Sequence, residues 1–287
     1  DTDFAATITD TSTTAALLNT FNGIVPGLIT ATNVTALSGT SAQLDTLIGN
    51  EGTTGNKVDL ADDVTITVNA DTTTAAQLNT INGISTDLVT ATAVTAVSGT
   101  ATQLTTLAGN EGTAGDKINL SPTIAVTVTA DTTTAAQLDA INGLSTANIT
   151  ATAVTAISGN ATQLNSLVAL EGTNANEINL KADVDFTLST AEGTTETILT
   201  AIRNASTGNV DAQNITKITG TRALLTTLIA AEGTASNEID LDTDFAATIT
   251  DTTTTAALLN TFNGIVPGLI TATNVTALSG TSAQLDT

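Results

Sequence analysis

Carboxylates recur once per repeat in the loops of this chain, and they are the side chains best suited to chemistry. Four glutamates that each stand just past a segment that reads as a helix open a Glu-Gly-Thr triplet, and aspartates stand near such turns. Carboxylate oxygens are the hard ligands that Ca²⁺ prefers. The sequence therefore predicts weak calcium sites with the candidate ligands Glu51, Asp59, Asp62, Asp63, Glu111, Glu171, Asp183, Asp185 and Glu232.

The same glutamates also have a purely structural interpretation. A carboxylate at the negative end of a helix dipole is slightly unfavourable and needs compensation. Each glutamate could obtain it by accepting N–H groups of its own loop and fixing the glycine turn. The chain contains neither a GGxGxD nonapeptide nor an EF-hand loop, so diffuse counter-ion binding stands beside specific calcium sites as the alternative.

Thr-x-Thr triplets form a second recurring set, at 65–67, 90–92, 127–129 and 150–152. If their strands stack, the hydroxyls and methyls form ranks that resemble the ice-contacting face of solenoid antifreeze proteins. Threonine is also a good strand former that fills a half-exposed face without any partner. An ice- or mineral-binding surface is therefore the third functional hypothesis for this chain.

Nucleophile and base chemistry lacks its usual residues here. The 287 residues include no His, Cys, Met, Trp or Tyr. Paired carboxylates can hydrolyse glycosides, but acidic residues that recur once per repeat indicate scaffold. The lack of Cys excludes disulfides and thiolate metal sites. The sequence therefore predicts a protein that is not an enzyme, with no catalytic residue and no cofactor beyond a possible Ca²⁺.

Charge and hydropathy narrow the range of partners. Six basic residues stand against 28 acidic ones, for a net charge of −22. Nucleic acid and anionic lipid both require clustered Lys and Arg, so divalent cations are the expected counter-species. With 41% hydrophobic residues the chain should fold. It has no apolar run of 18 residues, so we expect no membrane insertion.

The chain is built from repeats at two scales. Residues 1–46 return as residues 242–287 with one change, Ser12 to Thr253, and the chain starts at Asp1 without a methionine, so we expect a window from a longer array. Glycines spaced by 60 or 61 residues mark shorter units. These units are 1–60, 61–120, 121–180, an atypical 181–241, and the partial copy 242–287. Units of this size bury their apolar faces against neighbours.

Each unit reads as two strand-like runs and two helix-like runs. In the second unit, β-branched residues alternate with threonine in 64–68 and across 89–97, which predicts two strands with one buried face. Strands about 30 residues apart with a helix between them form a parallel crossover. The predicted fold is an α/β repeat, a right-handed α/β solenoid with parallel strands and short capped helices. The alternative is a string of separate small α/β or β-rich beads.

The helix starts carry a local signature. Thr74 is followed three residues later by Gln77, the spacing of a capping box. Asn82-Gly83, and Gly109-Asn110 after the next helix, then predict a left-handed stop. The capping pair recurs as Thr40/Gln43, Thr100/Gln103, Thr134/Gln137, Asn160/Gln163 and Thr281/Gln284.

The fourth unit departs from the pattern. It has Ala-Glu-Gly-Thr-Thr-Glu at 191–196 where its neighbours have Asp-Thr-Thr-Thr, and it carries both arginines, Arg203 and Arg222. This unit is either a regularly spaced contact site or the product of neutral divergence.

The run TTTAAQLNTINGISTDLVTATAVTAVSGTATQL at 72–104 resembles the Thr/Ala-rich repeats of giant cell-surface proteins of cyanobacteria and other aquatic bacteria. The resemblance implies an extracellular or cell-surface location and a role in surface layers, matrix, adhesion or motility. We expect a structural segment of a very long protein that self-associates into a filament or layer, or serves as a spacer. The alternative is the stalk of an adhesin whose binding domain lies outside this segment.

Overall fold

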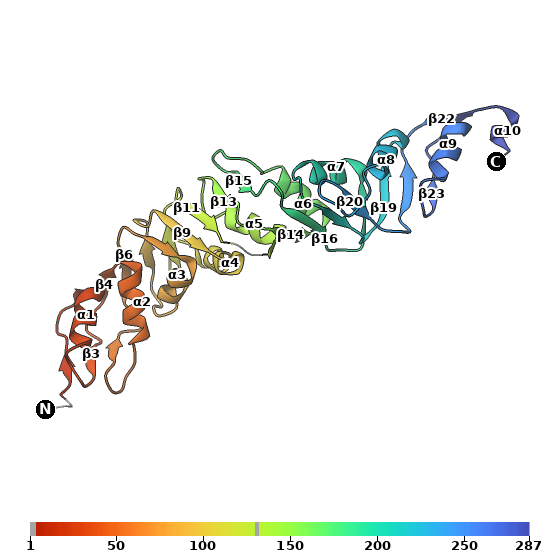
Figure 1. Cartoon of the computed structure of the whole chain (residues 1–287). Helices are drawn as coiled ribbons and strands as arrows, with labels where there is room; N and C mark the ends of the chain where they lie inside the picture. Colours follow the sequence, from red (N-terminus) through yellow and green to blue (C-terminus); the bar gives the residue numbers. More distant parts are fainter. Residues whose placement is uncertain (1–3, 130–131, 287) are drawn as a thin grey trace. The chain divides into compact units, whose positions relative to one another are not determined.

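The computed structural model describes residues 4–129 and 132–286. The described residues fall into two compact units, one made of 4–129, 137–151 and 173–179, the other of 132–136, 152–172 and 180–286. Short strands and helices alternate along the chain (Figure 1). Six sheets are present in the described part, and their strands pair in parallel. The predicted α/β class with parallel strands is confirmed.

The first unit holds three sheets. The first sheet has the order β1 (Ala6–Thr7), β3 (Ile29–Ala31), β5 (Val58–Leu60). The second has the order β2 (Ser12–Thr14), β4 (Ala36–Gly39), β6 (Thr65–Val68), β8 (Val89–Ala91), β10 (Ile118–Leu120). The third has the order β7 (Thr72–Thr74), β9 (Ala96–Gly99), β11 (Ala125–Val128), β13 (Ile149–Ala151), β15 (Ile178–Leu180).

The second unit also holds three sheets of parallel strands. Its first sheet has the order β12 (Thr132–Thr134), β14 (Ala156–Gly159), β16 (Asp185–Leu188), β18 (Val210–Ala212), β20 (Ile239–Leu241). Its second has the order β17 (Glu192–Thr195), β19 (Ile215–Gly220), β21 (Ala246–Ile249), β23 (Ile270–Thr271). Its third pairs β22 (Thr253–Thr255) with β24 (Ala277–Ser279).

Each five-stranded sheet joins two successive repeats. In the sheet that starts at β2, the strands β2 and β4 come from repeat 1–60, whereas β6, β8 and β10 come from repeat 61–120. The sheet that starts at β12 divides between repeats 121–180 and 181–241 in the same way. A 60-residue repeat is therefore not a self-contained bead within either unit.

The inward faces of the strands stack in register. Leu37 lies opposite Ile66, Ile66 opposite Val89, and Val89 opposite Ile118. All four side chains are buried. The threonines that alternate with them face outward, as the period-2 pattern predicted.

Repeat 61–120 contains more strands than the sequence pattern predicted. The expected run 89–97 is split by a turn into β8 and β9, and the short strands β7 and β10 were missed. The repeat thus contributes five strands, β6 to β10, where two were expected. Strands of three residues leave too little alternation to be recognised from sequence.

Ten short helices lie in the described part of the chain. Their bounds are α1 (Ala15–Asn22), α2 (Ser41–Gly49), α3 (Ala75–Asn82), α4 (Ala101–Asn110), α5 (Ala135–Asn142), α6 (Ala161–Val168), α7 (Glu196–Asn204), α8 (Arg222–Ile229), α9 (Ala256–Asn263) and α10 (Ser282–Leu285). Helices this short are unstable alone and depend on packing. Successive helices pack together, as α1 with α2, α2 with α3 and α3 with α4 do in the first unit.

The predicted capping boxes are confirmed at five helices, α2, α3, α4, α6 and α10. In each, the cap side chain accepts the N–H of the third helical residue, and the Gln side chain accepts the N–H of the cap. The pair Thr134/Gln137 stays a prediction.

The predicted left-handed helix stop is wrong. Gly83, which caps α3, has φ −75° and is right-handed. Left-handed residues instead lie in the loop after each Glu-Gly-Thr triplet, at Gly55 (φ 69°) and Gly115 (φ 67°), and one position further on at Asn176 and Asn237. The left-handed residues therefore lie in the loops that follow α2, α4, α6 and α8, and not at the end of α3. Gly109 and Asn110, the last residues of α4, are not left-handed either.

Candidate functional site

The first and second Glu-Gly-Thr loops each border a small hollow. Glu51 and Asp62 line one hollow of about 230 Å³, together with Gly83 and Ile84. In the next repeat Glu111 lines an equivalent hollow of about 360 Å³, but Pro122 stands where the second carboxylate would be. Two carboxylates thus line the first hollow and a single one lines the second.

The other predicted calcium ligands do not join these hollows. Asp59 is half-buried on β5, and Asp63 is exposed in the turn that follows. Glu171 and Glu232 are exposed as well. Among the described residues, no group of three or more acidic side chains has an arrangement that could hold a metal ion. Calcium at these positions stays a prediction.

Lysine, which the sequence interpretation did not consider, compensates the helix ends beside two of these loops. The ammonium of Lys57 donates to the carbonyl of Gly49 at the end of α2, at 3.0 Å. Lys117 donates to Gly109 at the end of α4, also at 3.0 Å. A cation at a helix C-terminus interacts favourably with the helix dipole and satisfies a free carbonyl.

The third and fourth repeats stabilise the same loop with a carboxylate instead of a lysine. Glu177 stands where Lys57 does, and its Oε2 accepts the backbone N–H of Asn174 at 2.8 Å. Glu238 Oε2 accepts the N–H of Ala235 at 2.9 Å. In both repeats a carboxylate six residues after the Glu-Gly-Thr glutamate fixes the loop, a structural role that was predicted for the Glu-Gly-Thr glutamates themselves.

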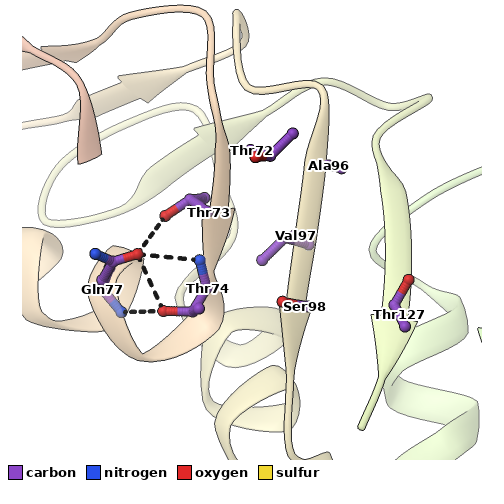
Figure 2. A pocket seen from close by; sticks show the side chains of 8 residues that line it. All are labelled: Thr72, Thr73, Thr74, Gln77, Ala96, Val97, Ser98 and Thr127. Carbon is purple, nitrogen blue, oxygen red and sulfur yellow. Dashed lines mark hydrogen bonds between the residues drawn. The ribbon is translucent and has the colours of Figure 1, made fainter. Parts of the chain in front are cut away.

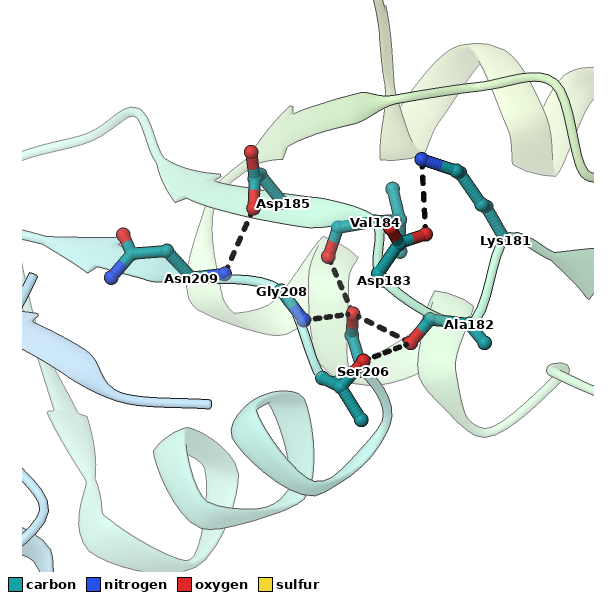
Figure 3. A network of polar contacts seen from close by, with 9 residues as sticks. Lys181, Ala182, Asp183, Val184, Asp185, Ser206, Gly208 and Asn209 are labelled. Atoms are coloured by element: carbon teal, nitrogen blue, oxygen red, sulfur yellow. Dashed lines mark hydrogen bonds and ion pairs between the residues drawn. The ribbon is translucent and has the colours of Figure 1, made fainter. Parts of the chain in front are cut away.

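The acidic residues around β16 form a local polar network (Figure 3). Lys181 and Asp183 make an ion pair at 3.0 Å. The hydrogen bond from Lys181 lowers the pKa of the exposed Asp183 carboxyl below its usual value. Asp185 Oδ1 accepts the N–H of Asn209 at 2.8 Å. Both predicted ligands therefore already have protein partners.

A second set of carboxylates, which the sequence interpretation missed, caps helices of the preceding repeat. Ser41 at the start of α2 donates its N–H (3.3 Å) and its hydroxyl (2.9 Å) to Asp71 Oδ2. Ala161 N–H donates to Glu192 Oε1, and Arg222 N–H donates to Asp251 Oδ2, both at 2.6 Å. Each carboxylate lies 29–31 residues after the helix start that it caps. The partial positive charge of a helix N-terminus favours this placement.

The edge strand β7 has its outward N–H groups covered by side chains. Thr72 N–H donates to Asp71 Oδ1 at 2.8 Å, and Thr74 N–H donates to Gln77 Oε1 at 3.3 Å. Figure 2 shows Gln77 turned toward Thr73 and Thr74. Covered donors and a length of three residues discourage another strand from adding to this edge.

Hydroxyl-lined hollows recur beside the first strand of three sheets, next to β2, β7 and β17. The hollow of about 280 Å³ at β7 is drawn in Figure 2 and lined by Thr72, Thr73, Thr74, Gln77, Ala96, Val97, Ser98 and Thr127. It holds no acid–base pair. Its equivalent at β17 differs by the ammonium of Lys217.

The predicted threonine ranks exist but are short. Thr67 lies opposite Thr90, and Thr127 opposite Thr150. Ser38 continues the first rank on one side. The hydroxyl of Thr65, which the pattern also assigned to a rank, donates to the carbonyl of Thr35 at 2.8 Å. Some of the threonine hydroxyls therefore form hydrogen bonds between one repeat and the next.

Comparisons with models of protein families, with curated proteins and with solved structures found no match for this chain. In the part of the chain that the structure describes, no helix combines the length and the apolarity needed to cross a membrane.

Proposed function

We propose that this chain is a structural repeat segment of a very long extracellular protein, forming a fibre, a surface layer or a spacer by self-association. Sheets shared between successive repeats are the observation that carries this proposal. Because β4 of one repeat pairs with β6 of the next, successive repeats are joined by shared sheets without a linker, which suits a load-bearing or spacing element.

The polar chemistry supports the same role. Carboxylates such as those of Asp71, Glu192 and Glu177 accept backbone N–H groups of the preceding repeat or of their own loop. Threonine and serine hydroxyls donate to backbone carbonyls of other segments, as Ser85 does to the carbonyl of Val64 at 2.6 Å. Side chains that link separate backbone segments in this way are typical of a structural protein. The resemblance of 72–104 to repeats of giant bacterial surface proteins supports the extracellular location.

Two experiments test the proposal. An antibody raised against this chain should label intact, non-permeabilised cells of its source, and labelling only after permeabilisation would contradict the extracellular location. Negative-stain images of the native protein should show uniform filaments or sheets. A thin stalk that ends in a globular head would favour the adhesin alternative, and isolated globules would contradict both.

A further inference from the structure

One strand pair recurs in every repeat, and its residues differ in the fourth. Thr72 at the start of β7 lies opposite Ala96 on β9. The equivalent pairs of three other repeats also join a hydroxyl residue to alanine, namely Ser12 with Ala36, Thr132 with Ala156, and Thr253 with Ala277. In the fourth repeat Gly193 on β17 lies opposite Lys217 on β19. Both members of the pair are therefore replaced together.

The two replacements fit each other. A Cβ added to Gly193 would lie 3.3 Å from Cε of Lys217, so the stem of the lysine lies across the glycine. Both residues are exposed, and β17 is the first strand of its sheet. A side chain at position 193 would crowd this stem. The glycine therefore helps to hold the ammonium over the outward face of β17 and β19.

The ammonium of Lys217 has no partner within the part of the chain that the structure describes. The other three lysines bond within the chain. Lys181 pairs with Asp183, and Lys57 and Lys117 donate to the helix ends at 49 and 109. The chain has 28 acidic residues, yet none of them neutralises Lys217 in the described structure.

The hollow around Lys217 adds hydroxyl donors and no acid. Its volume is about 630 Å³, and it is lined by Gly193, Thr194, Thr195, Thr216, Lys217 and Thr219. Thr195 lies opposite Thr219. The Thr195 hydroxyl accepts the N–H of Ile198 at 3.4 Å, which leaves its own proton to donate. An ammonium beside hydroxyl donors suits a carboxylate, whose oxygens accept from both kinds of donor.

We propose that the Lys217 hollow binds a carboxylate side chain of a second copy of this chain. Charge complementarity identifies the occupant, because a neighbouring copy presents 28 acidic residues and only six basic ones. At physiological ionic strength the Debye length is about 8 Å, so repulsion between more distant acids is screened whereas a pair in contact is not. The proposal rests on the self-association proposed above and names one contact for it.

Zero-length cross-linking tests the contact, because a carbodiimide joins an ammonium to a carboxylate only where the two groups touch. Equal amounts of isotope-labelled and unlabelled full-length chain are mixed at about 0.15 M salt, cross-linked, digested and analysed by mass spectrometry. We expect peptides that join Lys217 of one label to an acidic residue of the other, and few such links from Lys57 or Lys117. Links from Lys217 only within its own chain, or no link from Lys217, would overturn the proposal.

A substitution gives an independent measurement. Lys217→Gln should weaken association about two- to fivefold, the range expected for one exposed ion pair, and this difference should vanish at about 1 M sodium chloride. Lys181→Gln is the matched control, because it removes the same charge from the same repeat outside the hollow. Light scattering over a concentration series measures both variants. Equal weakening by the two would assign the effect to net charge and reject the contact.

The outcomes for this contact and for the proposed function are distinguishable. If the unmodified chain associates and Lys217→Gln associates equally well, the contact is wrong and the fibre role stands. If the unmodified chain stays monomeric at every concentration, self-association is wrong and the contact falls with it.

Discussion

At the scale of single residues, carboxylates link neighbouring repeats by accepting hydrogen bonds from helix starts. Asp71 bonds to Ser41 in the repeat before it through Oδ2 and to the edge strand β7 through Oδ1. Glu192 and Asp251 repeat the bond to a helix N-terminus. A negative net charge therefore does not imply that every acidic group is available to bind cations.

Replacing Asp71 with alanine should destabilise the chain by about 1–2 kcal/mol, because it removes a charged helix cap and leaves the N–H of Ser41 without its partner. Urea unfolding followed by circular dichroism measures the change. Asp63→Ala is the matched control, since Asp63 is exposed in a turn. Equal effects of the two substitutions would show that the cap contributes nothing.

The role of Asp71 could not be predicted from the sequence. Its partner lies 30 residues away, and no local pattern connects the two positions. The Glu-Gly-Thr glutamates recur in the sequence, but only the fold shows that Glu51 lines a hollow with Asp62, whereas Glu111 lines its hollow with Pro122.

At the scale of elements, the glycine that marks each period has a packing reason. A Cβ added to Gly99 at the end of β9 would lie 3.0 Å from the Cβ of Ala75, the first residue of α3. Gly39 has the same distance to Ala15. The strand end and the helix start approach so closely that only glycine fits without a shift.

Gly99→Ala should therefore destabilise the fold by about 1–3 kcal/mol through overpacking. Gly109→Ala is the control, because no atom lies within 4 Å of the added Cβ. Alanine in helix α4 should be neutral or stabilising by up to about 1 kcal/mol. Thermal melts of both variants give the comparison, and a loss of stability at Gly109 as large as at Gly99 would refute the packing explanation.

The elements differ in how far sequence predicts them. Capping boxes are complete within four residues, so Thr74/Gln77 and its equivalents were found. The strand β7 is a run of three threonines that reads as a cap, and β10 is three residues long. Both segments are strands because other strands lie beside them and pair with them, which is a property of the tertiary fold.

At the scale of the whole molecule, 28 acidic residues against six basic ones give strong self-repulsion. The melting temperature should therefore rise with sodium chloride. Millimolar CaCl₂ at matched ionic strength should raise it no further, because no group of three or more acidic side chains among the described residues could hold a metal ion. An additional rise with calcium that is lost in the Glu51→Gln variant would establish a specific site there.

Strands of successive repeats share one sheet. Hydrogen exchange on the Ile66→Ala variant measures whether the two repeats depend on each other through that sheet. Ile66 is buried in β6, opposite Leu37 of the preceding repeat and Val89 of its own. Truncating a buried isoleucine to alanine costs about 2–5 kcal/mol. Leu269→Ala, at a side chain that is 74% exposed, is the control and should change little.

Faster amide exchange is expected on both sides of β6, in 36–39 of the first repeat and in 89–91 of the second. Self-contained repeats would confine the change to 61–120. Faster exchange in both repeats is therefore the predicted result, and protection in 36–39 equal to that of the unmodified chain would contradict the shared sheet.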